Sequence, residues 1–299
     1  ALILLALVTR LWGLGDRVPS HDESIHMRYS WNLYAGRGFR HDPVMHGPFL
    51  FHATALSYFF FGDNDFSARI PVALIGVAVV AFPYLLRRWL GRAGALVTSF
   101  FLLISPSIAY YSRYIRHDIP VMLWALIILY AMLSYLEDGR ARWLRLMAVG
   151  VSLSFATKEV AFIYNAIFGL FLVVLLIARA LRSTQGGEEP GWKAKLIALW
   201  RHVRSQRAFD LIVVLGTLCL PFLAPGFIAL MGLDPLDYTM PTIKYSAVIV
   251  GGFLMISAWL GLVWDRRRWL PAAAIHYAIF VVLYTTFFTN GYGIASGMV

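Results

Sequence analysis

The chain has 299 residues, of which 60% are hydrophobic and 14% are charged, and its formal net charge is +10. So few charges cannot cover the apolar surface of a water-soluble domain, which excludes a soluble globular protein. A nucleic-acid partner is not predicted, because the cytoplasmic loops of a membrane protein account for the excess of Lys and Arg. The single cysteine, Cys219, excludes an intrachain disulfide framework.

Apolar runs separated by charged breaks recur along the whole chain, and several reach the roughly 20 residues that cross a bilayer. The sequence therefore predicts an all-α, polytopic integral membrane protein with about nine transmembrane helices. Both ends of the sequence lie beside apolar runs, so we expect a fragment of a longer chain, truncated at both ends. The predicted spans are 1–15, 68–86, 93–111, 119–136, 144–157, 160–181, 209–231, 245–264 and 270–288.

The charged breaks also predict how the chain is oriented in the membrane. The first loop, 16–66, holds few basic residues for its length and is predicted to be extracytoplasmic, with the 13-residue apolar run at 49–61 as an interfacial helix. The loop at 182–207 is predicted to be cytoplasmic and to end in an amphipathic helix on the membrane surface. By the positive-inside rule, the cytoplasmic breaks are those rich in Lys and Arg: 87–92, 137–145, 179–207 and 265–268.

The most polar stretch of the chain begins at Ser20 and reads SHDESIHMRYSWNLYAGRGFRHDPVMHGP. Ser20 and Glu23 have the spacing of a capping box, which explains both as the start of a helix. Asp22 and His26 share a helical face with Glu23, and capping does not explain them. Glu23 and His26 also have metal-ligand spacing, so a divalent metal ion is the cofactor to consider. The HExxH motif of zincins is excluded, because His21 and His26 are five residues apart.

A second polar segment precedes the predicted span at 119–136. Arg113, Arg116 and His117 fall within one predicted helical turn, and Asp118 follows them. Asp118 can be read as the cap of the next helix. Arginine is also well shaped to clamp phosphate, and two arginines on the side of the membrane that is poor in cations need a reason. The structural and the functional explanation both stay open.

Two smaller features belong with these segments. His46 precedes a Gly-Pro pair at the start of the interfacial helix, where an imidazole could receive a phosphate or simply mark a turn. Lys158 and Glu159 interrupt an apolar stretch and form either a tight turn or the lining of a cavity. We expect the acid, histidine and arginine clusters to converge with them on one extracytoplasmic cavity. Such a cavity suits an anionic lipid substrate, for a transferase or for a transporter.

The order of these motifs resembles the GT-C membrane glycosyltransferases, which include protein O-mannosyltransferases and the lipid A aminoarabinose transferase. The resemblance rests on the Asp22-Glu23 pair, the helix HGPFLFHATALSYFFFG that begins at His46, and four later motifs. Histidine beside the acid pair, His-Gly-Pro and the sequence TTFFTN are most similar to the flippase activity-associated family. The later motifs are Ser67-Ala-Arg69-Ile-Pro71, Ser105-Pro106, the Tyr-Ser-Arg segment up to Asp118, and Thr157-Lys158-Glu159.

This resemblance implies a polyprenyl-phosphate-linked sugar as donor and an inverting transfer on the extracytoplasmic side. It implies that Asp22 deprotonates or orients the acceptor, that Glu23 assists it or holds a metal, and that Asp118 is a second acidic position. It also implies that cations neutralise the lipid phosphate. The residues expected to bind substrate are His46, Arg113, Arg116, His117, Lys158 and Glu159.

The sequence therefore predicts a multi-pass, mannosyltransferase-like glycosyltransferase of the cell membrane. Its partners would be the lipid-linked sugar, an acceptor protein, lipid or glycan, and the surrounding membrane lipids. Two alternatives stay open: a flippase or transporter of a lipid-linked sugar, and a non-catalytic membrane subunit of a glycosylation pathway. Against the transporter, the sequence shows no internal repeat.

Overall fold

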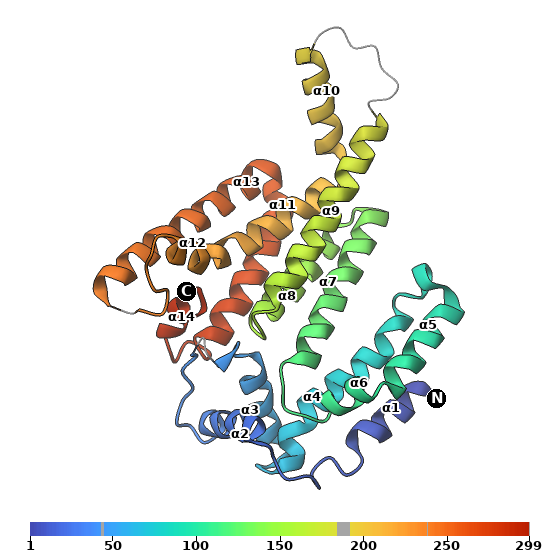
Figure 1. Ribbon diagram of the computed structural model, residues 1–299, viewed down its shortest axis with the longest axis vertical. Coiled ribbons are helices and arrows are strands. Elements are labelled where there is room, and N and C mark those ends of the chain that lie inside the picture. Colours follow the sequence, from blue (N-terminus) through green and yellow to red (C-terminus); the bar gives the residue numbers. More distant parts are fainter. Residues whose placement is uncertain (43–44, 184–191, 238, 299) are drawn as a thin grey trace. The chain divides into compact units, whose positions relative to one another are not determined.

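The computed structural model describes residues 1–42, 45–183, 192–237 and 239–298, and within these it is built of helices, with no strand (Figure 1). The all-α prediction is confirmed. The helices are α1 (Leu2–Leu11), α2 (His21–Tyr34), α3 (Phe49–Phe61), α4 (Asp65–Ala81), α5 (Arg87–Ile104), α6 (Pro106–Tyr111), α7 (Asp118–Asp138), α8 (Ala141–Phe155), α9 (Ala161–Ser183), α10 (Trp192–Ser205), α11 (Arg207–Cys219), α12 (Ala224–Leu230), α13 (Met240–Tyr284) and α14 (Tyr292–Met298), with short 3-10 helices η2 (Phe82–Tyr84) and η4 (Leu220–Leu223).

The chain forms two compact units. Unit 1 comprises Ala1–Tyr130, Ser152–Ala161 and Ala278–Gly297, and unit 2 comprises most of the remainder. In unit 1, α1, α4 and α5 lie side by side, and their contact is made by buried aliphatic side chains (Figure 1). A second core cluster joins α3, α4 and the start of α7 around fully buried residues such as Leu50, Val72 and Ile115.

Five helical segments among the described residues are long and apolar enough to cross a membrane. Nine spans are therefore not confirmed. The predicted span at 93–111 divides at Ser105, where α5 ends and α6 begins. The predicted spans at 1–15 and 144–157 correspond to helices of 10 and 15 residues. The five segments are Asp65–Tyr84, Asp118–Asp138, Ala161–Arg182, Arg207–Leu230 and Thr242–Tyr284.

The last of these segments is not one straight helix. Asp265 has non-helical backbone angles (φ −161°, ψ 97°) and interrupts α13. A Cβ atom placed on Gly261 would lie 2.2 Å from the indole ring of Trp269. In a straight helix these residues would be separated by roughly 12 Å along the axis, so the chain folds back at Asp265. The two predicted spans at 245–264 and 270–288 correspond to the two arms on either side of this break.

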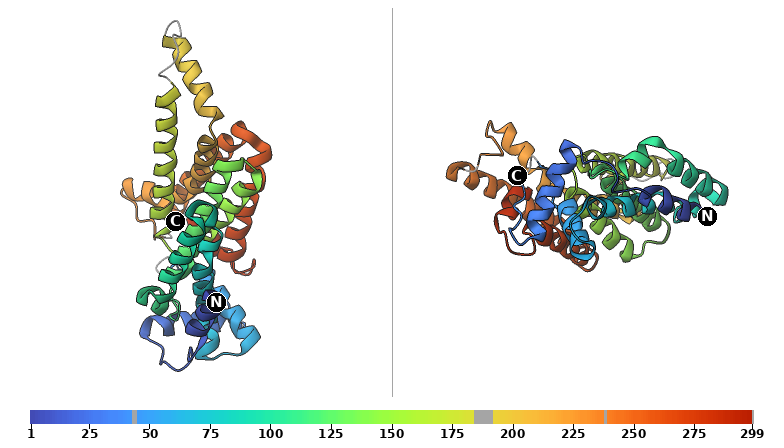
Figure 2. Two further views of the ribbon diagram at one scale, coloured as in Figure 1. Left: turned by 90° about the vertical axis from the view of Figure 1, so that its right-hand side faces the viewer. Right: turned by 90° about the horizontal axis from the view of Figure 1, so that it is seen from below.

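The predicted cytoplasmic loop at 182–207 falls partly outside the described residues. Its predicted helix is present as α10, which lies beside the C-terminal part of α9 in both views (Figures 1 and 2). Nη1 of Arg179 lies 3.4 Å from Oε1 of Gln206, a contact that ties the end of α9 to the residue after α10.

Candidate functional site

The predicted capping box at the start of α2 is confirmed. The backbone N–H of Glu23 donates to Oγ of Ser20 at 3.4 Å, and the N–H of Ser20 donates to Oε2 of Glu23 at 3.1 Å. Oγ of Ser20 also lies 2.5 Å from the hydroxyl of Tyr114. The cap therefore fixes the first turn of α2 against the segment that leads into α7.

Glu23 does more than cap this helix. Its Oε1 accepts a hydrogen bond from Nε of Arg69 at 3.0 Å, and both side chains are fully buried. Its Oε2 accepts from Arg17 at 2.7 Å, and the backbone N–H of Ile115 reaches Oε1 at 3.2 Å. Burial alone would raise the pKa of Glu23, but the hydrogen bonds from Arg69 and from the backbone outweigh it and lower that pKa. The carboxylate is thus ionised and surrounded by donors.

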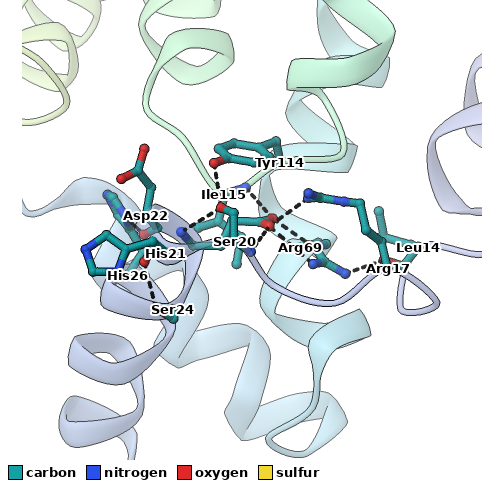
Figure 3. Close-up of polar contacts among 11 residues, drawn as sticks. Leu14, Arg17, Ser20, His21, Asp22, Ser24, His26, Arg69, Tyr114 and Ile115 are labelled. Carbon is teal, nitrogen blue, oxygen red and sulfur yellow. Dashed lines mark hydrogen bonds and ion pairs between the residues drawn. The ribbon is translucent and has the colours of Figure 1, made fainter.

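The side chain of Asp22, the residue before Glu23, points away from this buried cluster. Figure 3 shows Arg17 and Arg69 meeting beside Ser20, while the carboxylate of Asp22 points away from them. The side chain of Asp22 is 48% exposed and forms an ion pair with Arg116. Two consecutive residues in the first turn of α2 therefore differ in environment: Glu23 is buried in the fold, and Asp22 is accessible at the surface.

Asp22 is the first member of a row of alternating charges, which we call the charge chain: Asp22, Arg116, Asp118 and Lys158. Nε of Arg116 lies 3.8 Å from Oδ2 of Asp118, and Nζ of Lys158 donates to Oδ1 of Asp118 at 2.7 Å. Arg116 and Asp118 are 31% and 40% exposed at the side chain, and Lys158 is 15% exposed. Three segments distant in sequence thus place two cations and two carboxylates in one accessible row.

Three histidines lie beside the charge chain. Nδ1 of His26 is 2.8 Å from the backbone carbonyl of Asp22, which requires it to carry a proton. Nε2 of His26, 3.3 Å from Nδ1 of His117, is then the acceptor. The ring of His46 contacts that of His117 edge to face at 5.0 Å.

Burial sets the charge of the two inner rings. His117 is 1% exposed, and burial, followed by the neighbouring histidines His26 and His46, holds its pKa well below its usual range. Burial also lowers the pKa of His26, and the neighbouring side chains of His46 and Arg116 add to this. Both rings are therefore neutral near pH 7, which fits the tautomers assigned from their hydrogen bonds.

The backbone of His46 adopts a conformation that is uncommon for a residue other than glycine. It has a φ of 65°, in the left-handed region, and its Nδ1 lies 2.8 Å from the carboxylate of Glu159. Burial acts to raise the pKa of Glu159, but the hydrogen bond from His46, a backbone hydrogen bond and the nearby His46 and Lys158 together outweigh it and lower that pKa. Next to His46, the N–H of Gly47 donates to the carbonyl of Thr157 at 3.2 Å.

Gly47 packs against backbone so closely that a side chain is excluded. A Cβ atom there would lie 2.2 Å from the carbonyl of Ala156. The N–H of Phe49 donates to the same carbonyl at 2.8 Å. The His-Gly-Pro sequence is thus a docking segment that joins the first loop to the turn carrying Lys158.

Arg113 lies apart from the charge chain. Its guanidinium donates to the backbone carbonyls of Thr9, Trp12 and Gly13 at 2.7–3.0 Å, where α1 ends. The prediction that Arg113 and Arg116 share one helical turn is wrong, because α6 ends at Tyr111 and the helix of α7 starts only at Asp118. The irregular segment between them sends the two arginines to different partners.

The predicted metal ligands do not form a metal site in this conformation. Glu23 is enclosed by arginines, and His26 uses both ring nitrogens in hydrogen bonds. Among the described residues, no group of three or more His, Cys, Asp or Glu side chains is arranged to hold an ion. These residues do not fit a divalent metal ion, and no step below uses one.

Sequence reasoning gave no role to Arg69, which turned out to hold Glu23 in place. An arginine near the start of an otherwise apolar span is a signal that could have found it, because such a charge needs a partner. The sequence also gave no warning that Tyr114 would contact Ser20, since the two are 94 positions apart.

Comparison with known proteins supports the predicted resemblance in part. Residues 45–186 match the family model described as dolichyl-phosphate-mannose-protein mannosyltransferase. No curated protein matches the chain. The matched region includes three members of the charge chain and begins after Asp22. At the level of the family, the match supports a membrane glycosyltransferase that uses a lipid-phosphate-linked sugar.

Proposed function

We propose that this protein transfers a sugar from a polyprenyl-phosphate-linked donor to an acceptor hydroxyl of a protein, lipid or glycan on the extracytoplasmic face of the membrane. The observation that supports it most is the charge chain, in which two cations alternate with two carboxylates at an accessible surface. The match of residues 45–186 to a mannosyltransferase family agrees with this chemistry.

The cations of the charge chain have donors to spare for a phosphate. A guanidinium carries five N–H donors and an ammonium three, and the contacts of Arg116 and Lys158 with Asp22 and Asp118 use only some of them. The remaining donors can hold phosphate oxygens of the donor lipid. Asp118 accepts from Lys158 and faces Arg116, so it positions both cations.

Arrival of the donor also prepares the base. A phosphate bound to Arg116 competes with Asp22 for the guanidinium, which frees the carboxylate of Asp22. That carboxylate then takes the proton of the acceptor hydroxyl while the hydroxyl oxygen bonds to C1 of the sugar. The bond between C1 and the phosphate oxygen breaks, and its electron pair leaves with the polyprenyl phosphate. Arg116 and Lys158 stabilise this charge as it develops, and displacement from the opposite side inverts C1.

The other predicted site residues take distinct roles in this proposal. His46 and Glu159 are 31% and 55% exposed at the side chain, and border the substrate at the end of the charge chain. His117 is too deeply buried to touch substrate and instead positions His26 and His46. For Glu23 and Arg113 we propose structural roles, given the partners that occupy them.

The proposal is tested by reconstituting the protein in liposomes with dolichyl-phosphate-mannose and a membrane extract as acceptor source. Release of dolichyl phosphate and labelling of the extract are measured. Asp22→Asn should lower transfer by about 10²–10⁴-fold with unchanged thermal unfolding. Asp16→Asn is the matched control, because Asp16 is an exposed carboxylate of the same loop outside the charge chain.

An Asp22→Asn variant as active as the wild type would refute the role of Asp22 as base. Movement of the lipid across the bilayer without release of dolichyl phosphate would favour the flippase alternative. Full complementation of a deletion strain by a variant that lacks both Asp22 and Arg116 would favour the non-catalytic subunit.

A further inference from the structure

A pocket of about 340 Å³ lies beside α2, away from the charge chain. It is bounded by α2, by α3 and by the loop that starts α4. Its polar lining comes from Ser24, Arg28, Tyr58, Asp63, Asn64 and Asp65, and Trp31 closes one side. All of these belong to unit 1.

The pocket and the charge chain lie on opposite faces of α2. At about 100° per residue, positions 24, 28 and 31 lie about half a turn around the helix from positions 22 and 26. Asp22 and His26 contact Arg116 and His117, as described above. A ligand in the pocket is therefore separated from the charge chain by the width of α2, roughly 10 Å.

Tyr58 is the most informative residue of the pocket. It is 4% exposed, and its ring packs within the core cluster of α3, α4 and α7. The described residues offer its hydroxyl no hydrogen-bond partner, although the side chain lines the pocket. The hydroxyl is not one of the enclosed polar atoms that lack a partner, so it is accessible from the pocket, where a ligand can donate or accept a hydrogen bond. The hydroxyl of Tyr58 is therefore placed to form a hydrogen bond with a ligand that enters the pocket.

The other polar groups show what kind of partner this is. Asp65 and the second oxygen of Asp63 are acceptors, since only Oδ2 of Asp63 is used, by the indole N–H of Trp31 at 2.8 Å. Arg28 supplies donors, and its guanidinium rests 5.7 Å from the ring of Trp31. A small, open pocket that mixes carboxylate acceptors, a planar donor and a phenol suits a ligand with many hydroxyls, which both donate and accept.

We infer that this pocket binds a neutral saccharide, at a site distinct from the charge chain. The carboxylates of Asp63 and Asp65 would repel a phosphate. The guanidinium of Arg28 would repel a simple cation bound in the same pocket. A sugar unit satisfies both kinds of group without a net charge. The inference does not require the charge chain to be a transferase site.

The test is a binding measurement on the purified full chain in detergent. Ligand-observed saturation-transfer NMR is recorded with a panel of neutral probes: methyl α-mannoside, methyl β-glucoside, N-acetylglucosamine and maltotriose. At least one should bind with millimolar affinity. Tyr58→Phe should weaken that binding about three- to tenfold, the effect of one hydrogen bond. Asp65→Asn should weaken it as well.

Controls separate the pocket from folding and from catalysis. Tyr34→Phe is matched to Tyr58→Phe, since Tyr34 contacts the ring of Tyr58 but does not line the pocket; it should bind like the wild type. Tyr58→Phe should not lower the unfolding temperature, because it removes a hydroxyl without a partner. Asp22→Asn should retain saccharide binding whatever it does to transfer.

Each of the following results would overturn the inference. The first is that no saccharide of the panel binds. The second is that binding survives both Tyr58→Phe and Asp65→Asn unchanged, or is lost in Asp22→Asn. The third is that spermine displaces the bound sugar at much lower concentration than a second sugar does, which would identify a cation site instead.

Discussion

Nε of Arg69 lies 3.0 Å from Oε1 of Glu23, and water reaches neither side chain. Next to this pair, Asp22 makes its ion pair with Arg116 at a surface where the carboxylate is 48% exposed. Substitutions of these two adjacent acids should therefore lower the free energy of unfolding by different amounts. A buried charge that loses its partner is strongly destabilising, whereas a surface pair contributes about 0–1 kcal/mol.

We predict that Glu23→Gln lowers the free energy of unfolding by about 3–5 kcal/mol, because it leaves the guanidinium of Arg69 buried and unpaired. Thermal unfolding in detergent, followed by circular dichroism, measures this. Asp22→Asn is the matched control and should change stability by no more than about 1 kcal/mol. Equal stability losses in the two variants would contradict the assignment of Glu23 to the fold.

Lys158 should act on the donor rather than on the fold. We predict that Lys158→Met lowers kcat/KM for the lipid donor by about 10–100-fold, the effect of removing one charged hydrogen bond. Lys158→Arg should restore part of it, because the positive charge returns. Steady-state kinetics with varied donor concentration measure this. Lys244→Met removes an exposed lysine elsewhere and should have no effect; an equal loss there would contradict the prediction.

Gly47 should tolerate no side chain. A Cβ atom would lie 2.2 Å from the backbone of Ala156, so Gly47→Ala should destabilise unit 1 by about 1–3 kcal/mol and displace His46 from Glu159. Unfolding temperature and transfer activity should both fall. Gly169→Ala in α9, where a Cβ meets nothing within 4 Å, is the control and should leave both unchanged. A fully active and stable Gly47→Ala would show that the docking segment can move.

Acidification should destabilise the protein through its buried histidines. The pKa values of His26 and His117 are lowered on folding, and that of His41 is lowered to about 4 by burial. The unfolded chain, with histidine pKa values near 6.5, then binds more protons than the folded one. The free energy of unfolding should therefore be at its highest above about pH 6.5, and it should fall as the pH drops below that value.

The expected slope is up to about 1.4 kcal/mol per pH unit for each histidine. Unfolding temperatures measured between about pH 5 and 7.5 test this. His117→Gln cannot be protonated, so its curve should be flatter than that of the wild type while still sloping because His26 and His41 remain. Parallel curves for the two proteins would show that His117 is not a contributor.

Local rules predicted local structure well. The Ser20–Glu23 capping box formed as expected, because both partners lie within one turn of helix and no distant residue is needed. The arrangement of Asp22 with Arg116 and of Lys158 with Asp118 follows the expected convergence of the polar clusters. What these residues do in a reaction stays a prediction.

The features that the sequence did not predict involve irregular backbone and contacts between residues that are distant in the chain. Arg113 and Arg116 were placed on one helical turn by their spacing, but the segment after Tyr111 is not helical, and periodicity says nothing about such a segment. Arg69 and Glu23 are 46 positions apart, and no pattern in the sequence pairs them. The predicted span at 93–111 is divided at Ser105 and Pro106, although this apolar run is uniform in composition.

Arg113 gives the end of the first helix a role beyond the packing of its own side chains. The three carbonyls that hold this guanidinium belong to Thr9, Trp12 and Gly13, and Arg116 follows only three positions later. A version of the protein shortened past residue 13 would keep every member of the charge chain and still lose the backbone carbonyls that hold Arg113.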